Sequence, residues 1–268
     1  MTAVLGFSLL ALVGAVSGVI AGLVGLAGGI VIVPALTWMY GPSALHTAIT
    51  ISWFSVLFNS VGAASKQLRN RTQAERRELL QNARWYLLGT VLITPVVALL
   101  AAGEKQFVSR QLVAVLQLCL AAVMFMPITD SLAERREAPM RDAAFGGAIG
   151  AVSALIGVGG GTYTIAYFVY GTGTKFRDAI ATANVTGLVI GALSVAGYLT
   201  SLLLFRHEPE DASGPISSIG MATMIAAGVL AAPLGVRNSN KLPVKRLKQI
   251  LVVALMISAA RLLLSRPS

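Results

Sequence analysis

The stretch Gly22-Leu-Val-Gly-Leu-Ala-Gly-Gly-Ile-Val-Ile-Val-Pro34 interrupts a long apolar segment, residues 4–40, and Ala154-Leu-Ile-Gly-Val-Gly-Gly-Gly-Thr162 interrupts a second one, residues 143–172. A continuous helix as long as the first segment would measure roughly 55 Å, whereas the hydrocarbon core of a bilayer is ~30 Å thick. Clustered glycines break a helix, because glycine has no Cβ and admits unusual backbone dihedrals. Each segment is therefore predicted to turn back on itself as a hairpin with its tip at the glycines.

The composition is that of an integral membrane protein. Apolar residues make up 56% of the chain and charged residues 12%, outside the balance of a soluble domain. The net charge of +10 lies in or beside the short connections, so we interpret it as a topology signal and expect no nucleic-acid partner. Further apolar stretches, several of them near the roughly 20 residues that a transmembrane helix needs, occupy residues 46–64, 85–102, 108–127, 179–205, 216–235 and 249–264.

The two halves of the chain are a duplication. A shift of 132 residues, without a gap, aligns Gly18, Leu23, Gly25, Gly28, Gly29, Gly41 and Thr50 with Gly150, Leu155, Gly157, Gly160, Gly161, Gly173 and Thr182. We therefore divide the chain into a first transmembrane repeat (1–128), a cytoplasmic linker (129–142) and a second transmembrane repeat (143–268). Many transporters are built from internal repeats of this kind.

Loop charge favours one orientation of the repeats. If each Gly-rich segment returns to its own side, the loops 65–84, 128–142, 173–178 and 236–248 face the cytoplasm and carry 16 of the 21 Lys and Arg residues. If each segment crosses once, only 12 face the cytoplasm, so the positive-inside rule prefers the hairpins. The predicted fold is an all-α polytopic membrane protein with two inverted repeats, each a Gly-broken hairpin plus three transmembrane helices.

The two glycine motifs resemble the signature of the sulfite exporter family called TauE/SafE, and the likeness covers both halves. The resemblance implies a permease of the bacterial cytoplasmic (inner) membrane that exports sulfite, sulfonates or related sulfur-containing anions. It does not identify the substrate, since the family is broad. The second motif departs from the first, because Ala166 stands where the first has Pro34 and its middle is more polar. We therefore do not expect equal roles for the two halves.

The glycine breaks are the predicted substrate site. Where a helix resumes after a break, its first N–H groups are free and its end carries roughly half a positive charge. The preceding arm of each hairpin brings a negative helix end to the same tip, so the dipoles partly cancel. The predicted substrate-binding residues of the tips are Gly25, Gly28, Gly29, Gly157, Gly159, Gly160, Gly161 and Thr162. No metal or cofactor is expected.

Polar residues on the helices that follow the hairpins extend the candidate site. Thr50 and Ser52 match Thr182 and Asn184, and Asn59 lies further along the first of these helices. The two asparagines are the most informative, because an amide in an apolar span is costly without partners. Substrate contact and interhelical hydrogen bonding are equally good explanations for them, whereas bonding back to the helix is the simpler expectation for the threonines and Ser52.

His46 and Asp178 occupy matching positions where each following helix begins. The simpler interpretation is that both flank or cap their helices at the membrane interface. The alternative is gating or proton coupling.

The sequence thus predicts a permease that exports a small anion of the sulfite or sulfonate class by alternating access. The alternatives are a permease for another small organic anion such as a carboxylate, and a non-transporting membrane assembly partner. An intramembrane enzyme is not expected, since no serine or acidic pair with catalytic spacing lies within the spans. The expected partners are the small anion and the lipid bilayer, and a homodimer remains open.

Overall fold

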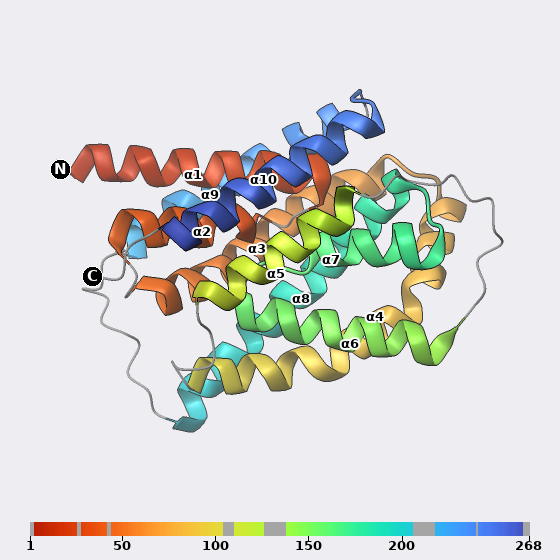
Figure 1. Ribbon diagram of the computed structural model, residues 1–268, viewed down its shortest axis with the longest axis horizontal. Helices are drawn as coiled ribbons and strands as arrows, with labels where there is room; N and C mark the ends of the chain where they lie inside the picture. The colour runs from red at the N-terminus through yellow and green to blue at the C-terminus, as the bar shows by residue number, and fades with distance from the viewer. Residues whose placement is uncertain are drawn as a thin grey trace.

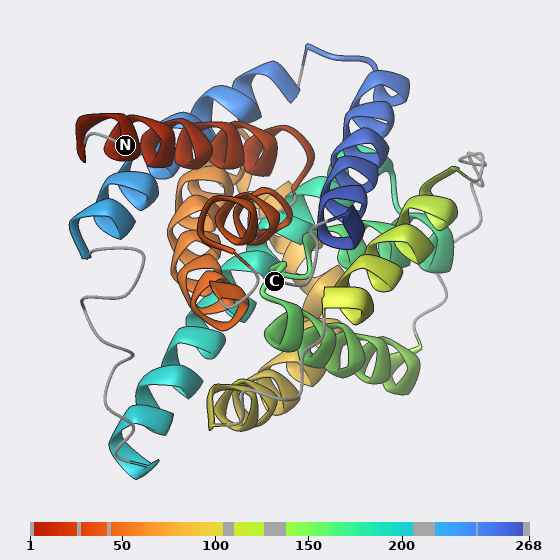
Figure 2. The same ribbon diagram turned by 60° about the vertical axis from the view of Figure 1, so that its left-hand side comes forward.

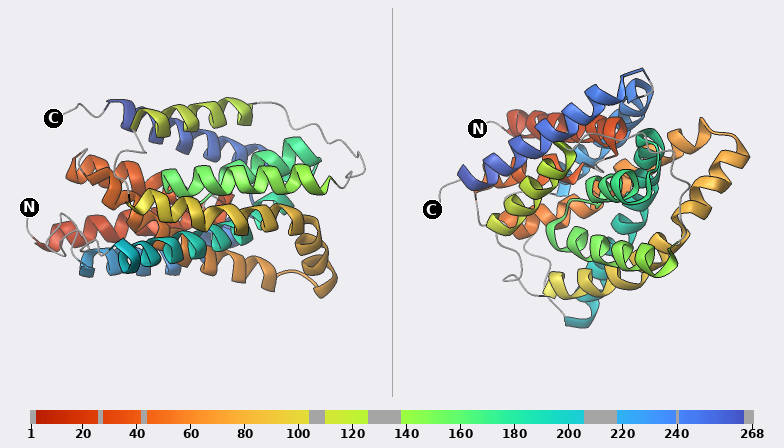
Figure 3. Two further views of the ribbon diagram at one scale, coloured as in Figure 1. Left: turned by 90° about the horizontal axis from the view of Figure 1, so that it is seen from below. Right: turned by 45° about the vertical axis from the view of Figure 1, so that its right-hand side comes forward.

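The computed structural model describes residues 3–25, 28–41, 44–103, 110–125, 138–205, 218–239 and 241–264, and all regular structure in these ranges is helical (Figure 1). Most helices run along the long axis of the molecule (Figure 3). In chain order they are α1 (Ala3–Val24), α2 (Gly29–Tyr40), α3 (Leu45–Arg69), α4 (Gln73–Gly103), α5 (Arg110–Phe125), α6 (Pro139–Ile156), α7 (Gly161–Ala166) with the π-helical turn η2 (Tyr167–Gly171), α8 (Phe176–Phe205), α9 (Ser218–Ser239) and α10 (Val244–Leu264).

Five of the described helices are long and apolar enough to cross a bilayer: α1, α3, α4, α8 and α9. Large apolar side chains on their outer surfaces are exposed, such as Leu92 and Leu230, which suits contact with lipid. The other expected spans include α5, which has 16 described residues, and α10, which carries Lys245, Arg246 and Lys248 in its first five residues. Their apolar stretches are therefore shorter than those of the five long helices. The chain is therefore an all-helical, multi-pass membrane protein.

Both Gly-rich segments are broken at their glycines, as predicted. Left-handed backbone conformations occur in equivalent pairs in the two halves, at Gly25 and Gly157 and at Gly28 and Gly160. L-residues other than glycine rarely adopt this conformation. After each break the chain folds back, so that α2 returns along α1 and η2 returns to the start of α6 (Figure 1).

The strongest helix pairings have counterparts in both halves. Helix α1 runs parallel to α9, with Gly14 against Met224 and Gly18 against Gly228, and α6 packs against α4 in the same way (Figure 2). Helices α3 and α8 are equivalent in the duplication and pack antiparallel. Their partners along the interface are Trp53 with Tyr198, Leu57 with Gly191, and Arg71 with Asp178.

Three of the basic loops meet at one end of the molecule, which we call the basic end. Arg71, after α3, forms an ion pair with Asp178 in the first turn of α8, and Arg177 donates a hydrogen bond to the Leu242 carbonyl before α10. Loops 65–84, 173–178 and 236–248 are thus side by side, an arrangement compatible with the prediction that all three face the cytoplasm. The predicted linker 129–142 lies outside the described residues up to 137, and α6 begins within it, at Pro139.

Candidate functional site

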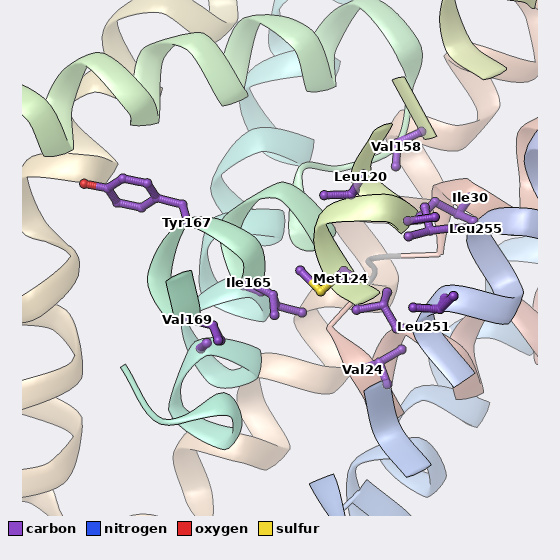
Figure 4. Packing of buried hydrophobic residues seen from close by; sticks show 14 of the residues in the cluster. Val24, Ile30, Leu120, Met124, Val158, Ile165, Tyr167, Val169, Leu251 and Leu255 are labelled. Carbon is purple, nitrogen blue, oxygen red and sulfur yellow. The ribbon is translucent and has the colours of Figure 1, made fainter. Parts of the chain in front are cut away.

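The two hairpin tips touch at the centre of the molecule. A methyl group built on Gly29 would lie 2.2 Å from the Gly157 carbonyl oxygen and 2.7 Å from the Ser52 hydroxyl. Around this contact, Ile30 and Val158 from the two tips pack with Leu120 of α5 and Leu255 of α10 (Figure 4). Glycine is therefore required at position 29 for close approach.

The first tip is held by a polar network between helices. Ser17 of α1 donates a hydrogen bond to the Gly28 carbonyl (3.2 Å), and the Asn59 amide of α3 donates to the Ser17 hydroxyl (3.2 Å). A methyl group on Gly28 would lie 2.1 Å from that hydroxyl. Of the two roles predicted for Asn59, the structure supports interhelical bonding, although its carbonyl oxygen has no partner among the described residues.

Two buried polar groups, one on the second tip and one on α8, are not paired. Asn184 is fully buried on α8, and neither amide atom has a hydrogen-bond partner in the described part of the chain. Helix α8 packs against α7 of the second tip, and its Ala183 lies beside Gly25 of the first tip. The Thr162 hydroxyl, also fully buried, has no partner there either. Such groups cost free energy unless something bonds to them. Thr162 and Asn184 can therefore bond to a ligand without first losing an internal hydrogen bond.

Ser52 connects the halves. Its hydroxyl donates to the Gly157 carbonyl at 2.5 Å rather than back to its own helix, contrary to the simpler expectation from sequence. The threonines of α8 do bond back, as Thr182 donates to the Asp178 carbonyl and Thr186 to that of Thr182. Thr50 is half-buried.

His46 and Asp178 lie at the starts of their helices, as predicted, but at opposite ends of the molecule (Figure 1). Asp178 is partly exposed and 2.6 Å from the Arg71 guanidinium. This ion pair ties the loop between α3 and α4 in the first half to the start of α8 in the second.

Sequence reasoning missed one buried acid. Asp142 was assigned to the cytoplasmic linker, yet it is 2% exposed in the first turn of α6, where it accepts a hydrogen bond from Tyr167 and pairs with Arg141. The available signal was Pro139, because proline is favoured at the first position of a helix. In a helix that begins at Pro139, Asp142 belongs to the first turn and not to the linker.

Two apolar grooves lie outside the tip contact. One, of about 320 Å³, is bounded by α1, α2 and α10 and includes Pro34, Trp38 and Arg261. The other, of about 670 Å³, is bounded by α5, α6, α7 and η2 and includes Arg141, Ala166 and Tyr170. The 132-residue shift relates Pro34 to Ala166 and Trp38 to Tyr170, so the grooves are equivalent in the duplication.

Within the described ranges, no group of three His, Cys, Asp or Glu side chains could hold a metal ion.

The family model for "Sulfite exporter TauE/SafE" matches residues 10–262. A Haemophilus influenzae protein described as "Probable membrane transporter protein" is 26% identical over 265 residues, which cover 94% of this chain and 96% of the relative. No solved structure matches significantly. This chain belongs to the TauE/SafE sulfite exporter family, and it is a membrane transporter rather than an enzyme.

Proposed function

We propose that this transporter exports a small sulfur oxyanion or sulfonate across a bacterial inner membrane, and that the anion binds between the two hairpin tips. The observation that carries the proposal is the fully buried Asn184 amide, unpartnered among the described residues, on the helix that packs against the second tip. A bound anion would accept a hydrogen bond from this amide and from the Thr162 hydroxyl. Its binding would then offset part of the cost of burying both groups.

The chemistry of the tips suits a monoanion. The N–H groups at the starts of α2 and α7 lack intrahelical partners and lie at positive helix ends. Asp142 is the one buried residue with a charged side chain in the described chain, and it lies at the start of α6 rather than at the tips. Partial charges and neutral donors would hold the anion weakly enough to release it. A sulfite or sulfonate group has several oxygens to accept these donors.

Alternating access follows if the two halves are inverted repeats, as we propose. Three observations support this: the hairpins enter from opposite ends, the equivalent helices α3 and α8 are antiparallel, and α1–α9 and α4–α6 are matching pairs. Exchanging the conformations of the two halves would open the tip contact first to one side and then to the other. With the basic end in the cytoplasm, the membrane potential would favour anion exit by about 2.3 kcal/mol per charge per 100 mV.

The test is efflux from vesicles containing the purified full-length protein. Vesicles loaded with sulfite, small sulfonates or small carboxylates should lose the sulfur anions faster than protein-free vesicles do. Asn184→Ala should abolish most of this flux, and Asn59→Ala, at matched protein content, should keep more of it. If the protein preferred carboxylates, the proposed substrate class would be wrong and carboxylates would take its place. Absence of flux for every anion would refute the transport proposal.

A further inference from the structure

The groove between α5, α6, α7 and η2, called here the α6 groove, has a charged rim and an apolar interior. Arg141 lies at its rim, at the start of α6. Tyr170 also lines the groove, and the Lys248 ammonium of α10 lies 5.8 Å from the centre of the Tyr170 ring. The interior is lined by aliphatic side chains that include Leu116, Leu120 and Val152. Polarity therefore changes sharply along the groove.

The length of the α6 groove fits one leaflet of a bilayer. Arg141 and Val152 on α6 both line it, and eleven helical residues rise about 16 Å, roughly half of the ~30 Å hydrocarbon core. The groove also opens outward, since Phe145 is 48% exposed and Cys119 is exposed. An acyl chain lying along α6 would have its headgroup beside Arg141.

The charge at the rim selects the headgroup. Arg141 carries five N–H donors, and its side chain bonds to Tyr167 and pairs at 3.4 Å with Asp142. Its side chain remains 42% exposed, so donors are available to a phosphate. Basic pockets between transmembrane helices at the cytoplasmic surface bind anionic lipid headgroups. A small hydrophilic anion would find few polar partners deeper in this groove.

We infer that the α6 groove is a binding site for an anionic phospholipid, with its phosphate at Arg141 and one acyl chain between α5 and α6. The site is separate from the tip contact and does not depend on the identity of the transported anion. The equivalent groove beside Trp38 is less suited to the same ligand. It has about half the volume, and the Arg261 guanidinium already lies 5.0 Å from the centre of the Trp38 ring.

Lipid binding to the purified full-length protein, measured by native mass spectrometry, tests the inference. Wild-type protein should bind phosphatidylglycerol at least fivefold more tightly than phosphatidylethanolamine. Arg141→Gln should reduce this preference to less than twofold, whereas Arg141→Lys should keep most of it. Arg237→Gln removes an exposed cation near the same end without touching the groove, and should leave the preference unchanged.

A second variant tests the acyl chain. Ala148 lines the groove and is exposed, so Ala148→Phe should fill the groove, keep the fold and weaken binding of both lipids. Equal lipid preference in wild type, Arg141→Gln and Arg237→Gln would overturn the inference. So would displacement of the lipid by millimolar inorganic phosphate or sulfite, because the groove would then be a site for a free anion.

Discussion

The two glycine tips have the same backbone but different polar surroundings. At the first tip, Ser17 donates a hydrogen bond to the Gly28 carbonyl and accepts one from Asn59, so the break is held by side chains of α1 and α3. Thr162 of the second tip and Asn184 of α8, which packs against that tip, are as deeply buried but have no partner among the described residues. Duplication preserved the break in both halves, while the side chains diverged. We interpret the network at the first tip as a support, and Thr162 and Asn184 as the groups that offer hydrogen bonds to the anion.

Gly29→Ala should have the largest effect, because it acts where both tips meet. The added methyl group would lie 2.2 Å from the Gly157 carbonyl oxygen, and backbone cannot move away cheaply. We expect about 1–3 kcal/mol of destabilisation and a loss of transport of roughly tenfold or more. Thermal unfolding and vesicle efflux measure the two effects.

The control for this variant is Gly62→Ala, whose methyl group would meet nothing nearer than 3.1 Å. If Gly29→Ala behaves like Gly62→Ala, the tips are not in functional contact.

The two asparagines should separate stability from transport. Asn184→Ala removes an amide that has no partner among the described residues, so stability should stay level or rise, while transport should fall by roughly tenfold to a hundredfold if its hydrogen bond to the anion is lost. Asn59→Ala leaves Ser17 without its donor and should cost about 1–2 kcal/mol of stability. Unfolding curves and initial efflux rates compare the variants. A large stability loss in Asn184→Ala would show that this amide is structural, and the contrast between the tips would disappear.

Ser52→Ala tests the bond that joins the halves. The Gly157 carbonyl would lose its hydroxyl donor, so we expect about 1 kcal/mol of destabilisation and a transport decrease of a few fold. Ser153→Ala is the matched control, because the Ser153 hydroxyl bonds back to the Ile149 carbonyl of its own helix. Similar losses in both variants would mean that the contact between halves has no special importance.

Asp178→Asn should have the smallest effect on stability. Its ion pair with Arg71 is partly exposed, and such pairs contribute about 0–1 kcal/mol and weaken with salt. Exchanging the two charges, with Arg71→Asp and Asp178→Arg together, should restore wild-type behaviour. A complete loss of transport in Asp178→Asn that the exchange does not rescue would instead make Asp178 a coupling residue.

Much of the fold follows from local sequence patterns. Runs of apolar residues predicted the long spans, and the glycine clusters predicted both breaks, since helix length and the conformational freedom of glycine act over short distances. Loop charge predicted that three basic loops share one side of the membrane, and in the structure these loops meet at the basic end. Of the candidate site, sequence identified the glycines, Ser52 and both asparagines as the residues of interest.

What each polar residue contacts was decided by tertiary structure. Asn59 and Asn184 are the same amide in similar apolar spans, and only the packing of α1 against α3 supplies Ser17 to one of them. Asp142 is buried because η2 returns to the start of α6 and brings Tyr167 to it. Residue type and spacing determine helices, breaks and charge distribution. A hydrogen-bond partner from a distant segment depends on how the helices pack, which no local pattern specifies.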